Sequence, residues 1–205
     1  CTCRRQRQMC IRDRFTNKEF DENKTSNEVK VSAKYKISNK LTLGLESESG
    51  KKTDDIGFLQ KKDGEIHFGR RDINSVENSL DLNFNIDNYK YLSLRFRNFW
   101  STANYDNVLF SLKNDGMREL TDNSKLDFDP NTNFNLWNLD LNFDWWFSPG
   151  STITLQYKNQ IFNRDNESGL KYYKSLKNLF EFPVEHQLSL RINYLIDFNK
   201  LRRND

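Results

Sequence analysis

The fold is decided by the stretch WNLDLNFDWWF at residues 137–147. Apolar residues occupy its odd-numbered positions, and Asn or Asp occupies its even-numbered positions up to Asp144. Successive side chains of a β-strand point to opposite faces, so only a strand places these two sets on separate faces. The stretch therefore predicts a β-strand with one apolar face and one polar face.

The same alternation of apolar and polar residues recurs along most of the chain. Clear strands are expected at 29–37, 80–86, 92–100, 137–147, 153–161 and 188–198, and weaker ones near 41–45, 65–71 and 105–112. Only Leu170 to Phe180 has apolar spacing that suits a helix, a short one inside a loop. The predicted fold class is all-β: an antiparallel meander of about nine strands.

One connection can be predicted in detail. Pro149 presets its backbone angle and Gly150 accepts the positive φ of a tight turn. We therefore expect Trp137–Phe147 and Thr152–Phe162 to form a long hairpin that closes at Ser148–Ser151.

Two architectures fit such strands: a soluble β-sandwich, and an outer-membrane β-barrel whose apolar face meets lipid. Several strands reach the roughly 9 to 11 residues that cross a bilayer. If the C-terminus is periplasmic and each strand crosses once, long connections fall outside and short ones inside, which is typical of barrels. The outer set is 47–64, 114–133 and 163–186, the inner set is 38–40, 72–79, 101–104 and 148–151, and the short connection 87–90 falls outside as an exception.

In the barrel interpretation each residue set has an expected environment. Residues expected to face lipid are Leu139, Leu141, Phe143, Leu190, Ile192 and Ile196. Residues expected to line the lumen and to pair across strands are Asp140, Asp144, Arg95, Arg97, Lys158 and Arg191. Aromatic residues expected at the membrane interfaces, or alternatively in a core, are Trp100, Trp137, Trp145, Phe147, Tyr194 and Phe198.

Composition excludes several classes of protein. No run of apolar residues exceeds three and the mean hydropathy is −0.89, which excludes transmembrane helices. Aromatic residues make up 14% of the chain, which argues against disorder. The net charge is +3, but residues 1–14 hold five Arg and one Asp, so the rest of the chain has a formal charge of −1. We therefore expect no nucleic-acid partner.

Residues 1–14, CTCRRQRQMCIRDR, differ from the rest of the chain and contain all three Cys. The string MCIRDR resembles translated sequencing-adapter read-through. We expect this segment to be non-native and unstructured, 15–28 to be a linker or strand remnant, and 29–205 to be the C-terminal barrel portion. The gene would then be cut at its 5′ end, and the sheet would be open with an unpaired edge near Val29–Ile37 or Gln187–Phe198. The alternative, a metal site at Cys1, Cys3 and Cys10, lacks a nearby His.

Several motifs resemble the C-terminal end of an outer-membrane protein family of unassigned function found in Bacteroidota. They are Asp127–Pro130, Phe134–Phe147, the turn Ser148–Ser151, Leu155–Lys158, Leu188–Phe198 and the short signature DIGFL at 55–59. The resemblance spans roughly Asp54 to Leu201. It implies a β-barrel preceded, in the family, by a carbohydrate-binding-module family nine-like sandwich that residues 15–205 do not encode. It supplies no catalytic residues.

Signals for chemistry are sparse. His67 and His186 are the only histidines and lie far apart in the sequence, and no phosphate loop, nucleophile elbow or His/Cys cluster occurs. Asp140 and Asp144 share a strand face, which could suggest a glycosidase pair or a calcium site. Lumen ion pairing explains them equally well. No catalytic residue, cofactor or metal is expected.

The sequence therefore predicts an outer-membrane β-barrel portion that acts as a membrane anchor, pore or receptor, linked to glycan binding or uptake. Its partners would be the lipid of a Gram-negative outer membrane, a glycan, and the upstream part of the same protein. The alternative function is a soluble, secreted β-sandwich that binds carbohydrate.

Overall fold

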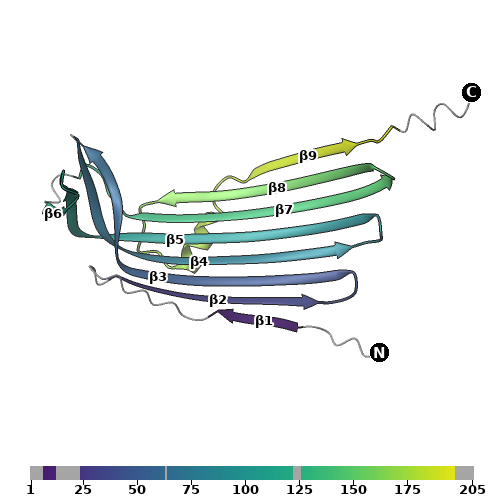
Figure 1. Ribbon diagram of the computed structural model, residues 1–205, viewed down its shortest axis with the longest axis horizontal. Coiled ribbons are helices and arrows are strands. Elements are labelled where there is room, and N and C mark those ends of the chain that lie inside the picture. The colour runs from purple at the N-terminus through teal and green to yellow at the C-terminus, as the bar shows by residue number, and fades with distance from the viewer. Residues whose placement is uncertain (1–6, 13–23, 63, 122–125, 197–205) are drawn as a thin grey trace, which may run out of the picture.

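The computed structural model describes residues 7–12, 24–62, 64–121 and 126–196, with side chains from residue 24 onward. These residues form one antiparallel sheet with the order β1-β2-β3-β4-β5-β7-β8-β9, and β6 pairs with the end of β5 (Figure 1). The strands are β1 (Arg7–Arg12), β2 (Thr25–Lys36), β3 (Leu41–Lys62), β4 (Glu65–Asn85), β5 (Lys90–Leu112), β6 (Arg118–Thr121), β7 (Thr132–Ser148), β8 (Ser151–Asp165) and β9 (Glu185–Asn193), with helix α1 at Tyr172–Leu179. The sheet is not closed: β1 and β9 form its two edges. The predicted all-β meander is confirmed.

The hairpin predicted between Trp137–Phe147 and Thr152–Phe162 is confirmed. β7 and β8 pair from Asn133 opposite Asp165 to Ser148 opposite Ser151, and Gly150 has a φ of 73°. A register shift between Trp146 and Ser148 places a bulge at Phe147, next to the turn.

The partition of the central strands differs from the prediction. Segments 65–71 and 80–86 belong to one strand, β4, and 92–100 and 105–112 belong to one strand, β5. The connections expected at 72–79 and 101–104 are therefore wrong, as is a long loop at 47–64, most of which is β3. Asn and Ser residues in these segments suggest turns. However, β4 has a hydrogen-bonded neighbour on both sides over most of its length, and that pairing keeps the backbone extended.

With this correction all the long connections lie at one end of the sheet, and the other end has only short ones. Residues 37–40, 86–89 and 149–150 lie at one end, which we call the short-turn end. The β3–β4 connection, which is also short, and the long connections from β5 to β7 and from β8 to β9 lie at the opposite end, the loop end. The connection 87–90, expected as an exception, now falls with the other short turns.

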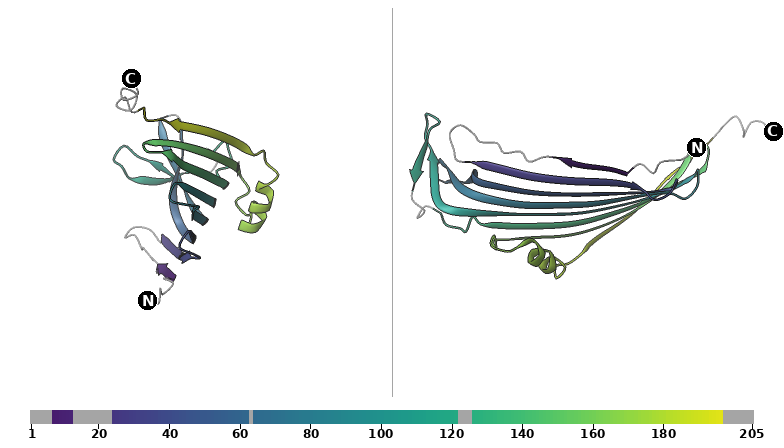
Figure 2. Two further views of the ribbon diagram at one scale, coloured as in Figure 1. Left: turned by 90° about the vertical axis from the view of Figure 1, so that its right-hand side faces the viewer. Right: turned by 90° about the horizontal axis from the view of Figure 1, so that it is seen from below.

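At the loop end the sheet continues as long, bent strands. β3, β4 and β5 have 22, 21 and 23 residues. Register shifts interrupt the ladders between Lys52 and Asp55 and between Gly69 and Arg71. Beyond these shifts the three strands bend away from the plane of the sheet, toward the side opposite α1 (Figure 2). Bulges are a common cause of such bends because they increase the local twist.

The segment 1–14 was expected to be unstructured, and for Arg7–Arg12 this is wrong. These residues form β1, which pairs with β2 from Arg7 opposite Tyr35 to Arg12 opposite Lys30. An open strand edge offers backbone N–H and C=O groups to almost any extended segment, so such pairing requires no matched side chains. Among the described strands none lies on the outer side of β9 at the other edge, as expected for Gln187 onward, and all residues of β9 are exposed. The non-native origin of residues 1–14 stays a prediction.

The first testable prediction concerns the turn between β7 and β8. Gly150→Ala should lower the free energy of unfolding by about 1–2 kcal/mol, because a Cβ is strained at positive φ. That Cβ would also lie 2.5 Å from Leu195 Cδ2. The measurement is denaturant unfolding in detergent micelles. Gly169→Ala is the control, since a Cβ there meets nothing within 4 Å. An equal effect of the two variants would contradict the assigned role of the turn.

Candidate functional site

The register of the sheet sorts its residues into an apolar face and a polar face. On the apolar face, aligned side chains form rows that run across seven strands. One such row is Tyr35, Leu43, Leu82, Leu94, Leu141, Tyr157 and Leu188. The adjacent row toward the short-turn end is Leu41, Phe84, Leu92, Phe143, Leu155 and Leu190.

Much of this apolar face is exposed. Relative exposure reaches 71% at Leu188 and 62% at Leu190, and Leu45 and Leu155 are also exposed. Among the described residues, no second sheet covers these side chains. Of the residues expected to face lipid, Leu139, Leu141, Phe143, Leu190 and Ile192 lie on this face, and Ile196 is exposed beyond the end of β9. An apolar face that the described residues leave partly uncovered is a candidate binding surface.

The apolar face changes character toward the loop end, where α1 covers it (Figure 2). Beneath the helix lie buried polar side chains in a hydrogen-bonded network. Asn98 donates to Asn135 Oδ1 at 3.0 Å, and Asn135 donates to Ser175 Oγ at 3.1 Å. Ser175 donates to Asn133 Oδ1 at 3.2 Å, and Tyr172 donates to Asn98 Oδ1 at 2.8 Å. The predicted short helix is thus confirmed, and its partners include amides as well as aromatic rings.

The opposite, polar face carries a row of charges across four adjacent strands: Asp81, Arg95, Asp140 and Lys158. Arg95 Nε lies 2.5 Å from Asp81 Oδ1, and Lys158 Nζ lies 3.9 Å from Asp140 Oδ1. Arg97 adds a third cation, with Nη2 3.6 Å from Asp140 Oδ2. Two hollows of about 280 and 290 Å³ flank this row. This charged row and its hollows are the best candidate for a polar ligand or ion path.

The structure brings together four of the six residues expected to line a lumen: Arg95, Arg97, Asp140 and Lys158. Asp144 instead accepts a hydrogen bond from Thr154 Oγ1 at 2.6 Å. Arg191 is exposed opposite Thr154 and makes no ion pair among the described residues. Asp81 was not among the residues expected to line a lumen. Its position between Leu80 and Leu82 nevertheless puts it on the polar face of the strand.

The aromatic residues expected at interfaces fall into three groups. Trp145, Phe147 and Tyr194 gather at the short-turn end, with ring centroids 5.9 and 6.2 Å apart. Trp137 lies at the far side of the apolar rows, where it contacts Phe96 and Phe180 at centroid distances of 4.0 and 5.0 Å.

Trp100 forms the third group by itself. It is only 6% exposed, packs against Tyr172 under α1, and donates from Nε1 to Asn133 Oδ1 at 3.0 Å. It therefore belongs to the buried network rather than to an exposed aromatic ring. Phe198, the remaining residue, lies outside the described residues.

A second polar cluster lies in the bent part of β3, β4 and β5, and it explains the DIGFL signature at 55–59. Asp55 is 8% exposed; its Oδ2 lies 2.9 Å from Arg71 Nε and its Oδ1 3.1 Å from Lys24 Nζ. Arg71 also donates to the Tyr105 hydroxyl at 2.8 Å. A Cβ on Gly57 would lie 2.3 Å from Arg71 Cζ, so glycine leaves the space that the guanidinium occupies.

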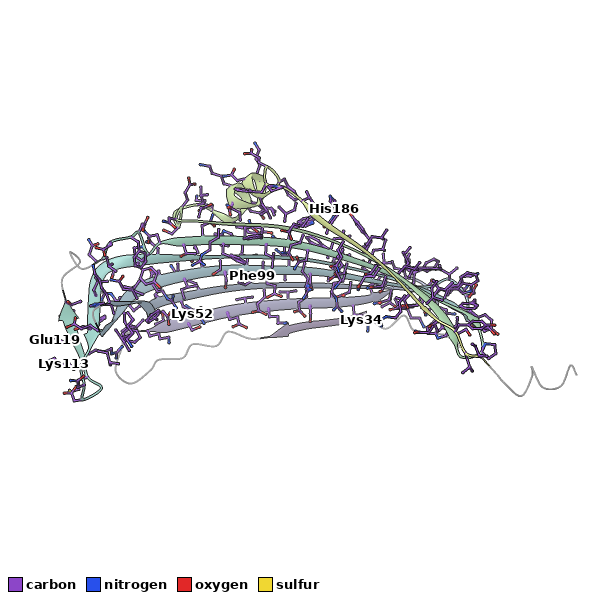
Figure 3. The ribbon with its side chains drawn as sticks, turned by 90° about the horizontal axis from the view of Figure 1, so that it is seen from above. Lys34, Lys52, Phe99, Lys113, Glu119 and His186 are labelled. Atoms are coloured by element: carbon purple, nitrogen blue, oxygen red, sulfur yellow. The ribbon has the colours of Figure 1, made fainter. Side chains whose placement is uncertain are left out.

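The histidines do not form a site. His67 is 2% exposed, its Nδ1 has no hydrogen-bond partner among the described residues, and its Nε2 lies 3.9 Å from Glu65. His186 lies on β9, where its Nδ1 contacts the Tyr157 hydroxyl at 2.8 Å. The ion pair of Lys113 and Glu119 lies far from it, at the loop end (Figure 3). Within the described ranges no group of three His, Cys, Asp or Glu could hold a metal ion. In the same ranges, no helix has the length and apolar character to cross a membrane.

The second testable prediction concerns Asp55. Burial alone would raise the pKa of its carboxyl, but hydrogen bonds and charges from Arg71 and Lys24 outweigh this and hold the pKa below its usual value. A lowered pKa in the folded state means that ionised Asp55 stabilises the fold above about pH 4, and that this stability is lost as the pH falls through the lowered pKa. Asp55→Asn should therefore lower the free energy of unfolding by about 1–3 kcal/mol at pH 7.

Urea unfolding at pH 7 and pH 3 measures this effect, and the difference between wild type and Asp55→Asn should shrink at pH 3. Asp106→Asn is the matched control. Asp106 pairs with Arg70 Nε at 2.5 Å, but both side chains are exposed, so we expect less than about 1 kcal/mol. A pH-independent difference for Asp55→Asn would show that its charge does not stabilise the cluster.

Comparison with known proteins gives a family without an assigned activity. No curated protein matches the sequence. The model of a domain of unknown function, DUF5916, matches residues 3–204, nearly the whole chain. This supports the resemblance to a family of unassigned function. The Bacteroidota source, the outer-membrane setting and the carbohydrate-binding-module-like sandwich before the barrel stay predictions. The chain belongs to the DUF5916 family.

Proposed function

We propose that this chain is the C-terminal part of an outer-membrane β-barrel, located in the outer membrane of a Gram-negative bacterium. In this proposal its apolar face meets lipid and its polar face lines the lumen. The observation that carries it is the pair of opposite faces: apolar rows that cross up to seven strands on one side, with no second sheet over them among the described residues, and the Asp81–Lys158 row of ion pairs on the other. A soluble sheet would cover the apolar side and leave the charged side in water.

The height of the apolar rows supports the proposal. Trp137 and Trp145 bracket them on β7. At about 3.4 Å per residue, the backbone between these two residues is about 27 Å long. A strand tilt of about 40° reduces this to about 21 Å, close to the roughly 25 Å apolar band of outer-membrane barrels.

The lengths of the connections also support the proposal. The short-turn end has three turns of two to four residues, as periplasmic ends have, while the loop end carries the long connections 113–131 and 166–184. The alternative function, a secreted carbohydrate-binding sandwich, requires a second sheet over the apolar rows. The described residues contain one sheet. We therefore advance only the barrel.

The polar face suggests what the barrel does. Its groups are alternating charges and amides that bond to one another, such as Gln156 Nε2 to Asn142 Oδ1 at 2.7 Å. Such groups can exchange their partners for the hydroxyls of a glycan or for water and ions. We propose a membrane anchor that also serves as a pore or receptor for a polar ligand, a glycan among the candidates, with no catalytic role.

The third testable prediction is a pair of neighbouring substitutions on β7 in the full-length protein. Leu141→Arg places a charge in the middle of the apolar rows and should destabilise the folded barrel by about 2–4 kcal/mol. Asn142→Lys changes charge on the polar face and loses one hydrogen bond, so we expect an effect of about 1 kcal/mol. The measurements are heat-modifiable migration and fractionation of the outer membrane.

Wild type and Asn142→Lys should fractionate with the outer membrane and migrate as folded species, and Leu141→Arg should lose both properties. Tolerance of both substitutions, or recovery of the wild type in the soluble periplasmic fraction, would overturn the barrel and favour the sandwich.

A further inference from the structure

Helix α1 lies where the apolar rows end. Its C-terminal neighbour Phe180 contacts Trp137, the residue that bounds the apolar rows on β7. Its first residue, Tyr172, bonds to Asn98 and Asn78, which are level with Trp137 in the register, and contacts Trp100, which lies closer to the loop end. If the apolar rows meet lipid, α1 therefore lies at the level of the lipid headgroups.

The sides of α1 differ in chemistry. A helix turns by about 100° per residue, so positions 172, 175, 176 and 179 share one side. That side faces the sheet, since Ser175 and Leu179 are buried and Tyr172 and Leu176 half-buried.

The flank of α1 next to Trp137 carries exposed aromatic rings. Tyr173 and Phe180, seven residues apart, are 82% and 52% exposed. The outward side carries the exposed lysines Lys171, Lys174 and Lys177. Aromatic rings beside apolar rows with lysines above them are typical of a helix in a membrane interface, where the rings enter the acyl boundary and the ammonium groups reach the headgroups.

The three lysines are available to bind anions. None of them makes an ion pair in the described part of the chain, whereas Arg95, Arg97 and Lys158 on the polar face are all paired. Residues 170–184 contain one acid, Glu181, so the segment has a formal charge of +2. This charge complements phosphate groups and not a cationic or neutral surface.

We infer that α1 binds the phosphorylated headgroups of outer-leaflet lipid, with Lys171, Lys174 and Lys177 as the phosphate-binding residues and Tyr173 and Phe180 as the inserted aromatics. This inference rests on the proposed barrel. It assigns the loop 166–184 a role in fixing the depth of the protein in the membrane.

The experiment uses the full chain folded into phosphatidylcholine vesicles with or without lipid A, the phosphorylated anchor of lipopolysaccharide. Chymotrypsin cleavage after Tyr173 and Phe180 reports access to the loop. Lipid A should slow this cleavage by about tenfold or more, since each lysine at an anionic surface contributes about 1 kcal/mol. The triple variant Lys171→Gln, Lys174→Gln, Lys177→Gln should lose this protection while retaining every chymotrypsin site.

A second triple variant, Lys51→Gln, Lys52→Gln, Lys61→Gln, is the matched control. It removes the same charge from exposed positions on β3 toward the loop end, with Lys52 just before the bend of the strand (Figure 3), and should keep the protection. Inorganic phosphate added to phosphatidylcholine vesicles should give no protection.

Three results would overturn the inference, and they differ in whether the proposed barrel is overturned as well. Full protection of the Lys171/Lys174/Lys177 variant, or equal protection by inorganic phosphate, would overturn lipid binding by α1 and leave the barrel intact. Extraction of the wild type from vesicles by alkaline carbonate would overturn the barrel and the inference together.

Discussion

The constraint on which the rest of the structure depends is the register of the antiparallel ladders. From β2 to β9 the pairing near the short-turn end runs without a shift up to the bulge beside Ser148. A slip of one residue in any ladder would move that strand's leucines to the charged face and its Asp and Arg to the apolar face. The register of each pair of strands therefore determines which residues of the next strand lie on which face. The apolar and polar faces exist only because every ladder keeps its register.

The turns protect this register. Pro149 and Gly150 allow only a tight reversal, so Ser148 must meet Ser151. At the 86–89 turn, Asp87 accepts a hydrogen bond from the Tyr89 amide at 2.8 Å, and at 37–40 the Ser38 hydroxyl accepts from Lys40 and Leu41 at 3.1 Å. Side chains that bond to their own turn reduce the number of loop conformations and thus the number of competing registers.

The sequence predicted the strands near the short-turn end well because their alternation is local. Residues 137–147 show both faces directly, and Pro149-Gly150 shows where the chain reverses. The pairing of Asp81 with Arg95 was harder to predict from the sequence, because it depends on the register across the 86–89 turn. The continuity of β4 through Asn74 and Ser75 could not be read from the residues alone, since neighbouring strands keep that segment extended. Asn98 visibly interrupts the alternating apolar residues of β5. Nothing in the neighbouring sequence indicated that a helix more than seventy residues later would cover it.

The meander topology has a consequence for how the sheet assembles. Among the described strands, every ladder from β1 to β5 and from β7 to β9 joins neighbours in the sequence, and only the β5–β7 ladder spans an intervening hairpin. Most steps then close a short loop, and the entropic cost of closing the longer β5–β7 and β8–β9 connections grows only slowly with their length. Folding can start at any tight hairpin and add strands one at a time from both sides. Since each added strand covers the edge of the one before it, this order limits the time during which strand edges are open to other molecules.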